Sequence, residues 1–262
     1  MNFIEVNGTA LRYELSGNGG STLVLIHEMG GTLESWDLVR FRLAGRRKVL
    51  RYDTRGAGLS QKVSGALSID TMTDDLIALM DALDVTGRVV LAGVAVGGAI
   101  ALHTAVRHPQ RVAAVIASSP AVGIAPDRRL GLLARVEQME RLGLNAVIDT
   151  LDNGYPAELR GDAQRFAEFR ARWLGGDPMS YGAIYRMLIH TDLQPELPQI
   201  ACPVLVTAGT LDRVRPPHLV EPVARAIPVA RYAVLETAHY APVQTPDLYG
   251  RTVGEFLDTI GL

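Results

Sequence analysis

The sequence predicts an α/β fold with a mostly parallel central sheet flanked by helices. Short apolar runs rich in strand-forming residues recur along the chain, and most lack the alternation of half-exposed strands. Segments with helical periodicity lie between these runs, as expected where crossover helices join parallel strands. One long interval contains helical patterns only, which indicates an inserted helical segment.

The predicted strands are mostly continuous apolar runs, which is typical of strands buried on both faces of a sheet. The opening segment differs, because residues 3–6 and 11–15 flank Asn7-Gly8, a pair that favours a tight antiparallel hairpin at the sheet edge. The remaining predicted strands cover residues 23–26, 48–52, 89–92, 112–117, 204–207 and 232–235.

Three segments have the pattern of helices that pack on such a sheet. Apolar residues repeat every three or four positions from residue 69 to 83, and Asp70 and Thr71 suit the start of a helix. Residues 97–107 are small and apolar nearly all round, which predicts a buried helix. Residues 247–260 are amphipathic, so we expect a final helix with one apolar face.

The interval from about residue 122 to 199 has no convincing strand. Helical stretches at 132–144 and 163–173 lie within it, separated by Gly-Asp and Asp-Pro turns. Because insertions of this length are usually functional, we interpret it as a helical lid over the sheet. The predicted division is a core of residues 1–121 and 196–262, with a lid of residues 122–195.

The composition argues against several classes of protein. The chain has 262 residues, 48% hydrophobic and 21% charged, as is ordinary for a globular protein with a sizeable core. A formal net charge of −2 gives no basic field for nucleic acid or an acidic membrane. No apolar run approaches the ~18 residues that span a bilayer. The single cysteine, Cys202, and an N-terminal start without a secretory pattern favour a cytoplasmic location.

A strand that runs straight into a helix through closely spaced glycines is the strongest chemical signal. The sequence there is Gly93-Val94-Ala95-Val96-Gly97, which matches the G-x-S-x-G nucleophile elbow in spacing and context. Such a sharp turn forces its central residue into a strained conformation and needs small flanking residues. The central residue here is Ala95, which has no nucleophilic atom.

The other expected groups follow in the order nucleophile, acid, histidine. Asp212 comes just after the strand predicted at 204–207, and His239 follows the last strand. Asp212 would fix the tautomer of His239, which would act as general base. The backbone N–H groups of Met29 and Val96 could form an oxyanion hole, because both follow predicted strands at the same edge.

Three segments carry a resemblance to a known family: RYDTRG at 51–56, SYGAI at 180–184 with Asp192-Leu193, and HYAPVQTP at 239–246. The chain resembles the α/β-hydrolases over nearly its whole length, and within them it is similar to the 3-oxoadipate enol-lactonases. The resemblance implies hydrolysis of a small lactone, ester or related acyl compound through a serine nucleophile. It implies no metal ion and no organic cofactor. The expected partner is a small-molecule substrate, with no nucleic acid and no membrane.

The chain departs from the family pattern at three positions, one of which is Ala57, where His or another polar residue is common. Ala95 stands where the family has serine, and Glu28 stands where the wider family usually has glycine. Three interpretations of Ala95 stay open: a serine replaced to trap substrate, a natural lyase or isomerase that uses His239 as its base, or a ligand-binding pseudoenzyme. Glu28, Tyr181 and Trp173 are the predicted substrate-binding side chains, and an arginine of the lid could bind a carboxylate.

Overall fold

The computed structural model describes residues 2–44, 47–63 and 65–262, and it contains an eight-stranded sheet in the order β1-β2-β4-β3-β5-β6-β7-β8. Strands β3 to β8 are parallel to one another. At one edge, β1 pairs antiparallel with β2, and β2 pairs antiparallel with β4. All eight predicted strands are present, with bounds β1 (Asn2–Val6), β2 (Thr9–Ser16), β3 (Ser21–Ile26), β4 (Arg47–Tyr52), β5 (Val89–Val94), β6 (Val112–Ser118), β7 (Val204–Gly209) and β8 (Ala230–Leu235).

The hairpin of β1 and β2 forms as the sequence predicts. Val6 pairs with Thr9, so Asn7 and Gly8 alone form the turn, with φ values of 46° and 69°. Positive φ at both central residues is the geometry of a type I′ turn, whose twist matches that of the two strands. Asn and Gly are the residues that adopt this conformation at least cost.

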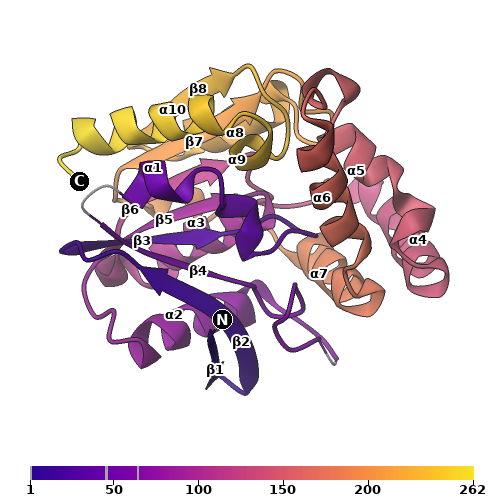
Figure 1. Cartoon of the computed structure of the whole chain (residues 1–262), viewed down its shortest axis with the longest axis horizontal. Helices are drawn as coiled ribbons and strands as arrows, with labels where there is room; N and C mark the ends of the chain where they lie inside the picture. Colours follow the sequence, from indigo (N-terminus) through magenta and orange to yellow (C-terminus); the bar gives the residue numbers. More distant parts are fainter. Residues whose placement is uncertain (1, 45–46, 64) are drawn as a thin grey trace.

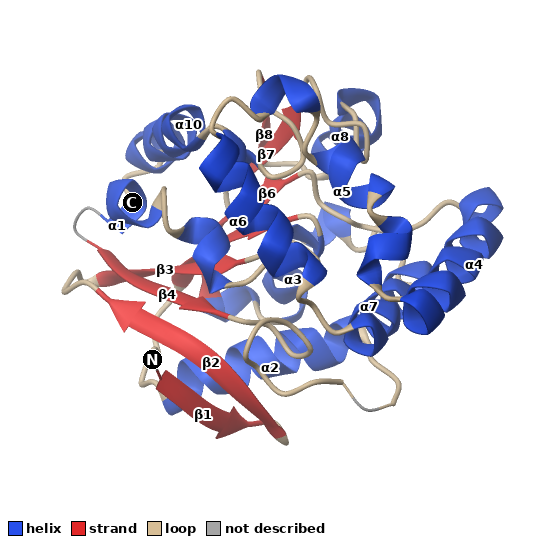
Figure 2. Ribbon diagram, turned by 45° about the vertical axis from the view of Figure 1, so that its right-hand side comes forward, coloured by secondary structure: helices blue, strands red, loops and turns tan. Residues whose placement is uncertain are grey.

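Helices cover both faces of the sheet, and helices also occupy the chain between β6 and β7 (Figure 1 and Figure 2). The predicted helices at 69–83, 97–107 and 247–260 correspond to α2, α3 and α10. The helical bounds are α1 (Arg40–Ala44), α2 (Ile69–Ala82), α3 (Val96–Arg107), α4 (Pro126–Leu142), α5 (Asp149–Gly154), α6 (Ala163–Leu174), α7 (Pro178–His190), α8 (Pro217–Ala226), α9 (Ala241–Gln244) and α10 (Pro246–Thr259).

The residues of each central strand alternate between two buried layers. In β3, Leu23 and Leu25 pack with α1 and α10, while Val24 and Ile26 pack with α2 and α3 on the opposite face. Both layers are apolar, which explains why the strands are continuous hydrophobic runs rather than alternating ones. The result is a helix–sheet–helix arrangement that keeps the sheet rigid beneath its loops.

The helical segment between β6 and β7 contains α4 to α7 and no named strand in this fully described stretch. The helix expected at 132–144 instead runs from Pro126 to Leu142. Proline is suited to the first position of a helix, so the helix begins earlier than the apolar pattern indicates. It ends before Gly143, whose φ of 81° is left-handed.

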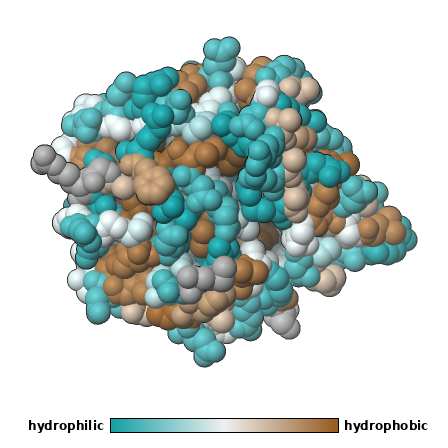
Figure 3. Space-filling model, in the orientation of Figure 1, coloured by the Kyte–Doolittle hydropathy of each residue, from teal (hydrophilic) through white to brown (hydrophobic). Residues whose placement is uncertain are grey.

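The surface in the orientation of Figure 1 is a mosaic of hydrophilic and smaller hydrophobic areas (Figure 3). Within the described ranges, no helix combines the length and the hydropathy needed to cross a bilayer. Cys202 is buried and has no disulfide partner, and burial raises the pKa of its thiol. This agrees with an inert core thiol, because a thiol with a raised pKa forms little reactive thiolate.

Candidate active site

Ala95 lies at a strained turn between β5 and α3. Its φ of 51° and ψ of −110° are unusual for a residue with a Cβ, and such a conformation costs on the order of 1–3 kcal/mol. The turn is held by backbone hydrogen bonds: the N–H of Ala95 donates to Ser118 O at 2.9 Å, and its carbonyl accepts from Ala121 N at 3.0 Å. The strand-to-helix elbow predicted from the glycine spacing is therefore present.

The glycines at 93 and 97 are required by close backbone approaches. A Cβ on Gly93 would lie 2.1 Å from Gly97 O, and a Cβ on Gly97 would lie 2.2 Å from Ile26 O. These distances are well below van der Waals contact, so any side chain at either position would force the strand and helix apart. The spacing in the sequence thus reflects the packing of β5, α3 and β3.

His239 and Asp212 are hydrogen-bonded at the carboxyl ends of their strands. The distance from His239 Nδ1 to Asp212 Oδ2 is 2.8 Å, and both side chains are buried. Within the described part of the chain, Nε2 of His239 has no hydrogen-bond partner, and His239 lines the main cavity. Because an ionised carboxylate accepts only, the bond orients the ring with its Nδ1 proton toward Asp212.

Four donors surround the carboxylate of Asp212. Oδ2 accepts from His239 and from the Ser119 hydroxyl at 2.8 Å, while Oδ1 accepts from the backbone N–H groups of Val214 and Arg215, each at 2.8 Å. Burial alone would raise the pKa of Asp212, but the charge and hydrogen bond of His239 outweigh it, with help from the Arg215 N–H and Ser119, and lower the pKa to about 2. Asp212 is therefore ionised at neutral pH.

Two backbone N–H groups are available near Ala95. Val96 is the first residue of α3, so its N–H has no acceptor within the helix. Met29 follows β3 and precedes Gly30, whose φ is 79°. Met29, Ala95, Val96 and His239 all line the same cavity, which brings the predicted oxyanion donors, the elbow and the imidazole to one space.

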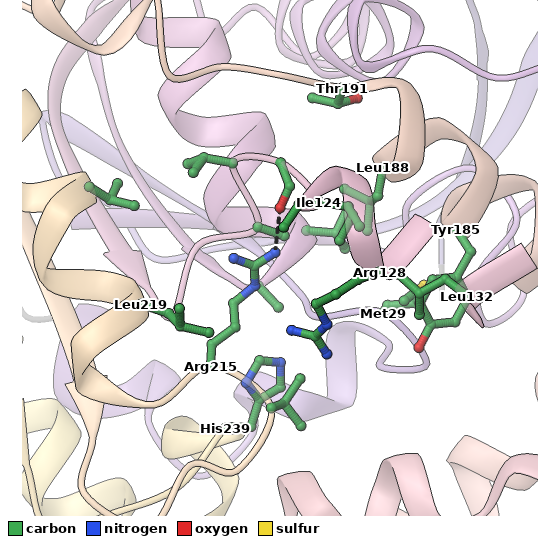
Figure 4. A pocket seen from close by; sticks show the side chains of 18 of the residues that line it. Met29, Ile124, Arg128, Leu132, Tyr185, Leu188, Thr191, Arg215, Leu219 and His239 are labelled. Carbon is green, nitrogen blue, oxygen red and sulfur yellow. Dashed lines mark hydrogen bonds between the residues drawn. The ribbon is translucent and has the colours of Figure 1, made fainter. Parts of the chain in front are cut away.

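That space is a cavity of about 690 Å³ between the carboxyl ends of the strands and the helical segment that follows β6. Its walls come from the loops after β3, β5, β6, β7 and β8, together with α4, α5, α7 and α8. Figure 4 shows His239 at one end of the pocket, with Arg128 and Arg215 beside it and Met29, Leu132 and Tyr185 farther along. Pockets of this size suit small organic ligands.

Only Tyr181 of the three predicted substrate-binding side chains lines this cavity. Its hydroxyl lies 3.5 Å from Met29 O, and burial raises its pKa well above the ordinary value, so it stays protonated. Trp173 is fully buried in an aromatic cluster, with its ring centroid 5.6 Å from that of Tyr181. The position of a residue in a helix does not tell whether its side chain lines a pocket or packs in a core. In this structure Trp173 packs in a core.

Glu28 is also not a cavity-lining residue. Its carboxylate is buried and accepts a hydrogen bond from Ser35 Oγ at 2.7 Å. A Cβ on Gly31 would lie 2.3 Å from Glu28 Oε1, so the carboxylate packs against the turn that carries Met29. Glu28 therefore supports the loop after β3 rather than facing the ligand space.

The sequence did not single out Ser119 or Arg215, and it offered Arg128 only as one of several lid arginines that could bind a carboxylate. Ser119 has a φ of 44° and donates to Asp212, but a serine after a strand has no sequence signal for that role. Arg128 and Arg215 line the cavity near His239, whereas the sequence could not distinguish them from the other arginines nearby. Contacts between loops that are far apart in sequence decide both roles.

Sequence and structure comparisons find relatives along nearly the whole chain. The family described as serine aminopeptidase, S33 matches residues 20–239. The chain belongs to this α/β-hydrolase family. The family match includes the elbow, Asp212 and His239, and the eight-stranded sheet is the fold of an α/β-hydrolase.

Two enol-lactonases align with this chain over nearly its full length. The enol-lactonase of Burkholderia xenovorans LB400 has a TM-score of 0.91 at 30% identity, and the alignment covers 98% of this chain and 100% of that one. The 3-oxoadipate enol-lactonase 2 of Acinetobacter baylyi is 26% identical over 247 residues, or 93% of this chain and 91% of that protein.

A third relative is similar to this chain over only part of its own length. The dihydrolipoyllysine-residue acetyltransferase component of the acetoin cleaving system of Pseudomonas putida is 41% identical over 112 residues. The match covers 42% of this chain and 30% of that protein, so the similarity is limited to less than a third of that relative. The full-length relatives are thus the informative ones for the site.

Proposed function

We propose that this site is that of a nucleophile–His–Asp hydrolase for a small lactone, ester or amide, with Ala95 at the nucleophile position. One observation carries the proposal: His239 is bonded to Asp212 through Nδ1 and lines the same cavity as the strained elbow residue Ala95. A buried aspartate, a histidine and an elbow in this order form the constellation of acyl-transfer enzymes on this fold. The enol-lactonase names of the full-length relatives support a lactone or ester substrate.

Each group has a defined role in the proposed reaction. A serine oxygen at position 95 would attack the carbonyl carbon while His239 Nε2 takes its proton. Asp212 would hold the imidazole and stabilise the imidazolium, and the N–H groups of Met29 and Val96 would donate hydrogen bonds to the developing oxyanion. His239 would then return the proton to the leaving group, and water would hydrolyse the acyl-enzyme by the same steps in reverse.

With alanine at position 95, the first step has no nucleophile. Removing the nucleophile of such a triad costs on the order of 10⁶-fold in rate, and about 10³–10⁴-fold catalysis over water remains from binding and the oxyanion hole. The chain as given would therefore bind its substrate and release product very slowly. We propose that residues 122–195 form the lid of this site and that the protein is cytoplasmic.

A second candidate is a lyase or isomerase in which His239 removes a proton from the substrate without a covalent intermediate. The observation that favours it is the intact His239–Asp212 pair beside an alanine, because a base needs no neighbouring nucleophile. A ligand-binding pseudoenzyme is the remaining alternative, and it requires no catalytic role for either residue.

The test is Ala95→Ser, assayed on simple methyl esters and on γ-lactones. The hydrolase proposal expects the hydrolysis rate to rise on the order of 10⁶-fold, with a burst of released alcohol equal to the enzyme concentration. Ala226→Ser is the matched control, because it adds the same hydroxyl to the same cavity from α8, away from the elbow, and no gain is expected. An unchanged rate in a correctly folded Ala95→Ser variant would overturn the proposal.

A further inference from the structure

The cavity carries an excess of positive charge. Five arginines and two aspartates are among the residues that line it. Arg135 pairs with Asp149 at 2.6 Å, and Arg213 pairs with Glu158 at 3.2 Å. The other three, Arg128, Arg129 and Arg215, have no carboxylate partner within the described ranges. Guanidinium groups that face a pocket without a counter-charge are available to an anionic ligand.

Arg215 is held in place by the loop that carries the catalytic acid. Its backbone N–H donates to Asp212 Oδ1, and its Nη2 donates to Gly123 O at 3.2 Å, the contact drawn as a dashed line in Figure 4. Burial lowers the pKa of Arg215 to about 10, with a further lowering by Arg128 and an opposing effect of Asp212. The group is still cationic at neutral pH, and an anionic ligand would stabilise a half-buried cation that has no carboxylate partner among the described residues.

Arg128 approaches the same space from the opposite wall. It lies in the first turn of α4, it is exposed, and its side chain has no hydrogen bond to any described residue. Figure 4 shows its guanidinium directed toward the region between Arg215 and His239. The positive charges of Arg128 and Arg215 lie close together near the N-terminus of α4, the positive end of that helix. The two charges repel each other, and a bound anion would stabilise the arrangement.

We propose that Arg128 and Arg215 form a subsite for a free carboxylate of the substrate, so that this cavity selects esters or lactones that carry a carboxylate. This inference rests on the proposed function, because it places the carboxylate on the molecule whose carbonyl reaches position 95. Most of the nearby wall is apolar, with Ile124, Leu132, Leu188 and Leu219 suited to hydrocarbon.

Binding can be measured on the chain as it is, because alanine at position 95 prevents rapid turnover. NMR titrations would compare the monomethyl esters of glutarate, adipate and pimelate with the corresponding neutral dimethyl esters. We expect at least one monoester to bind about ten-fold more tightly than its diester, since a charge-assisted hydrogen bond contributes about a ten-fold factor or more. Raising the salt concentration should reduce this preference.

Arg128→Gln and Arg215→Gln should each reduce the preference about ten-fold while the diester binds as before. Arg170→Gln is the matched control, because Arg170 is an exposed arginine of α6 that does not line the cavity. Arg128→Gln alters an exposed side chain, so it keeps the test valid if Arg215→Gln fails to fold. A preference that survives Arg128→Gln, or no preference at all, would overturn the subsite.

Two further outcomes are informative. Tighter binding of butyl phosphate than of every monoester, with the same dependence on both arginines, would overturn the assignment to carboxylate. If Ala95→Ser hydrolyses dimethyl adipate but no charge preference exists, the subsite is wrong and the hydrolase proposal stands. If the charge preference depends on both arginines but Ala95→Ser hydrolyses nothing, the hydrolase proposal is wrong and the anion subsite stands.

Discussion

His239 and His103 are both buried histidines hydrogen-bonded to carboxylates, but of the two only His239 keeps a ring nitrogen without a partner among the described residues. His103, in α3, contacts Glu196 through Nδ1 at 2.8 Å and Asp70 through Nε2 at 2.9 Å. Within the described ranges, the side chain of His239 is hydrogen-bonded only to Asp212, and its ring lines the cavity. A histidine can act as a base only where one nitrogen is free to reach a ligand.

The two histidines also differ in whether they link structural elements or adjoin the cavity. His103 links the first turn of α2 to Glu196, just before the segment that leads to β7, and its hydrogen bond is the main cause of the lowered pKa of Asp70. His103 is not one of the cavity-lining residues. Burial and a carboxylate neighbour are therefore insufficient to identify a candidate base, and the adjoining cavity is what makes His239 the proposed one.

The largest expected effect is that of His239→Ala in the Ala95→Ser background. Loss of the base should lower kcat on the order of 10⁶-fold, because nucleophile and base act as one unit. Steady-state ester hydrolysis measures it, and circular dichroism controls for folding. Retention of more than a tenth of the activity would break the comparison, since His239 would then be no more catalytic than His103.

Asp212→Asn in the same background should have the next largest effect. The amide preserves the shape of the acid but favours the wrong tautomer of His239, which costs about 10⁴-fold in kcat. The measurement is kcat for ester hydrolysis as a function of pH. An unaltered kcat would show that Asp212 does not orient the imidazole.

Acid stability provides a smaller and independent effect. The folded-state pKa of Asp212 is about 2 against an ordinary 3.8, so ionised Asp212 stabilises the fold above pH 4 and this contribution is lost as the pH falls toward 2. The full contribution is about 2 kcal/mol, of which about 1 kcal/mol should be lost between pH 5 and pH 3. Urea unfolding of the native chain and of Asp212→Asn tests it, and parallel pH profiles for the two would contradict it.

The smallest effect on activity is expected for His103→Gln. Loss of its two carboxylate contacts should reduce the free energy of unfolding by about 1–3 kcal/mol. Hydrolysis by the Ala95→Ser chain should stay within about two-fold of its parent, because His103 does not line the cavity. A collapse of activity at full stability would show that the distinction between the two histidines is wrong.

The core of the fold and the order of the candidate catalytic residues were predictable because local sequence determines them. Continuous apolar runs predict strands β3 to β8, the Asn7-Gly8 pair predicts the hairpin of β1 and β2, and the close approach of β5 to α3 requires the glycines at 93 and 97. Asp212 and His239 follow strand ends, so a parallel sheet brings them to one edge. These features depend on few contacts between distant residues.

The cavity wall was less predictable because partners distant in sequence determine it. Arg135 and Arg213 resemble Arg128 and Arg215 in the sequence, yet the first two are neutralised by Asp149 and by Glu158, which is 55 residues away from Arg213. Trp173 belongs to a helix whose periodicity does not reveal which neighbour covers it. The sequence did not predict α8, because this helix follows Pro216, begins with Pro217 and contains Pro222. Proline is suited to the first turn of a helix but is not typical of its interior.

The most direct measurement of the central claim is covalent labelling with a fluorophosphonate, followed by intact-mass spectrometry and peptide mapping. If His239 activates an oxygen at position 95, Ala95→Ser should gain one phosphonyl group, on the peptide that contains the introduced serine, within minutes. The native chain should stay unlabelled, and addition of His239→Ala should slow the labelling of Ala95→Ser at least about 10³-fold. Equal labelling of the native chain, or a folded Ala95→Ser protein that remains unlabelled, would contradict the claim.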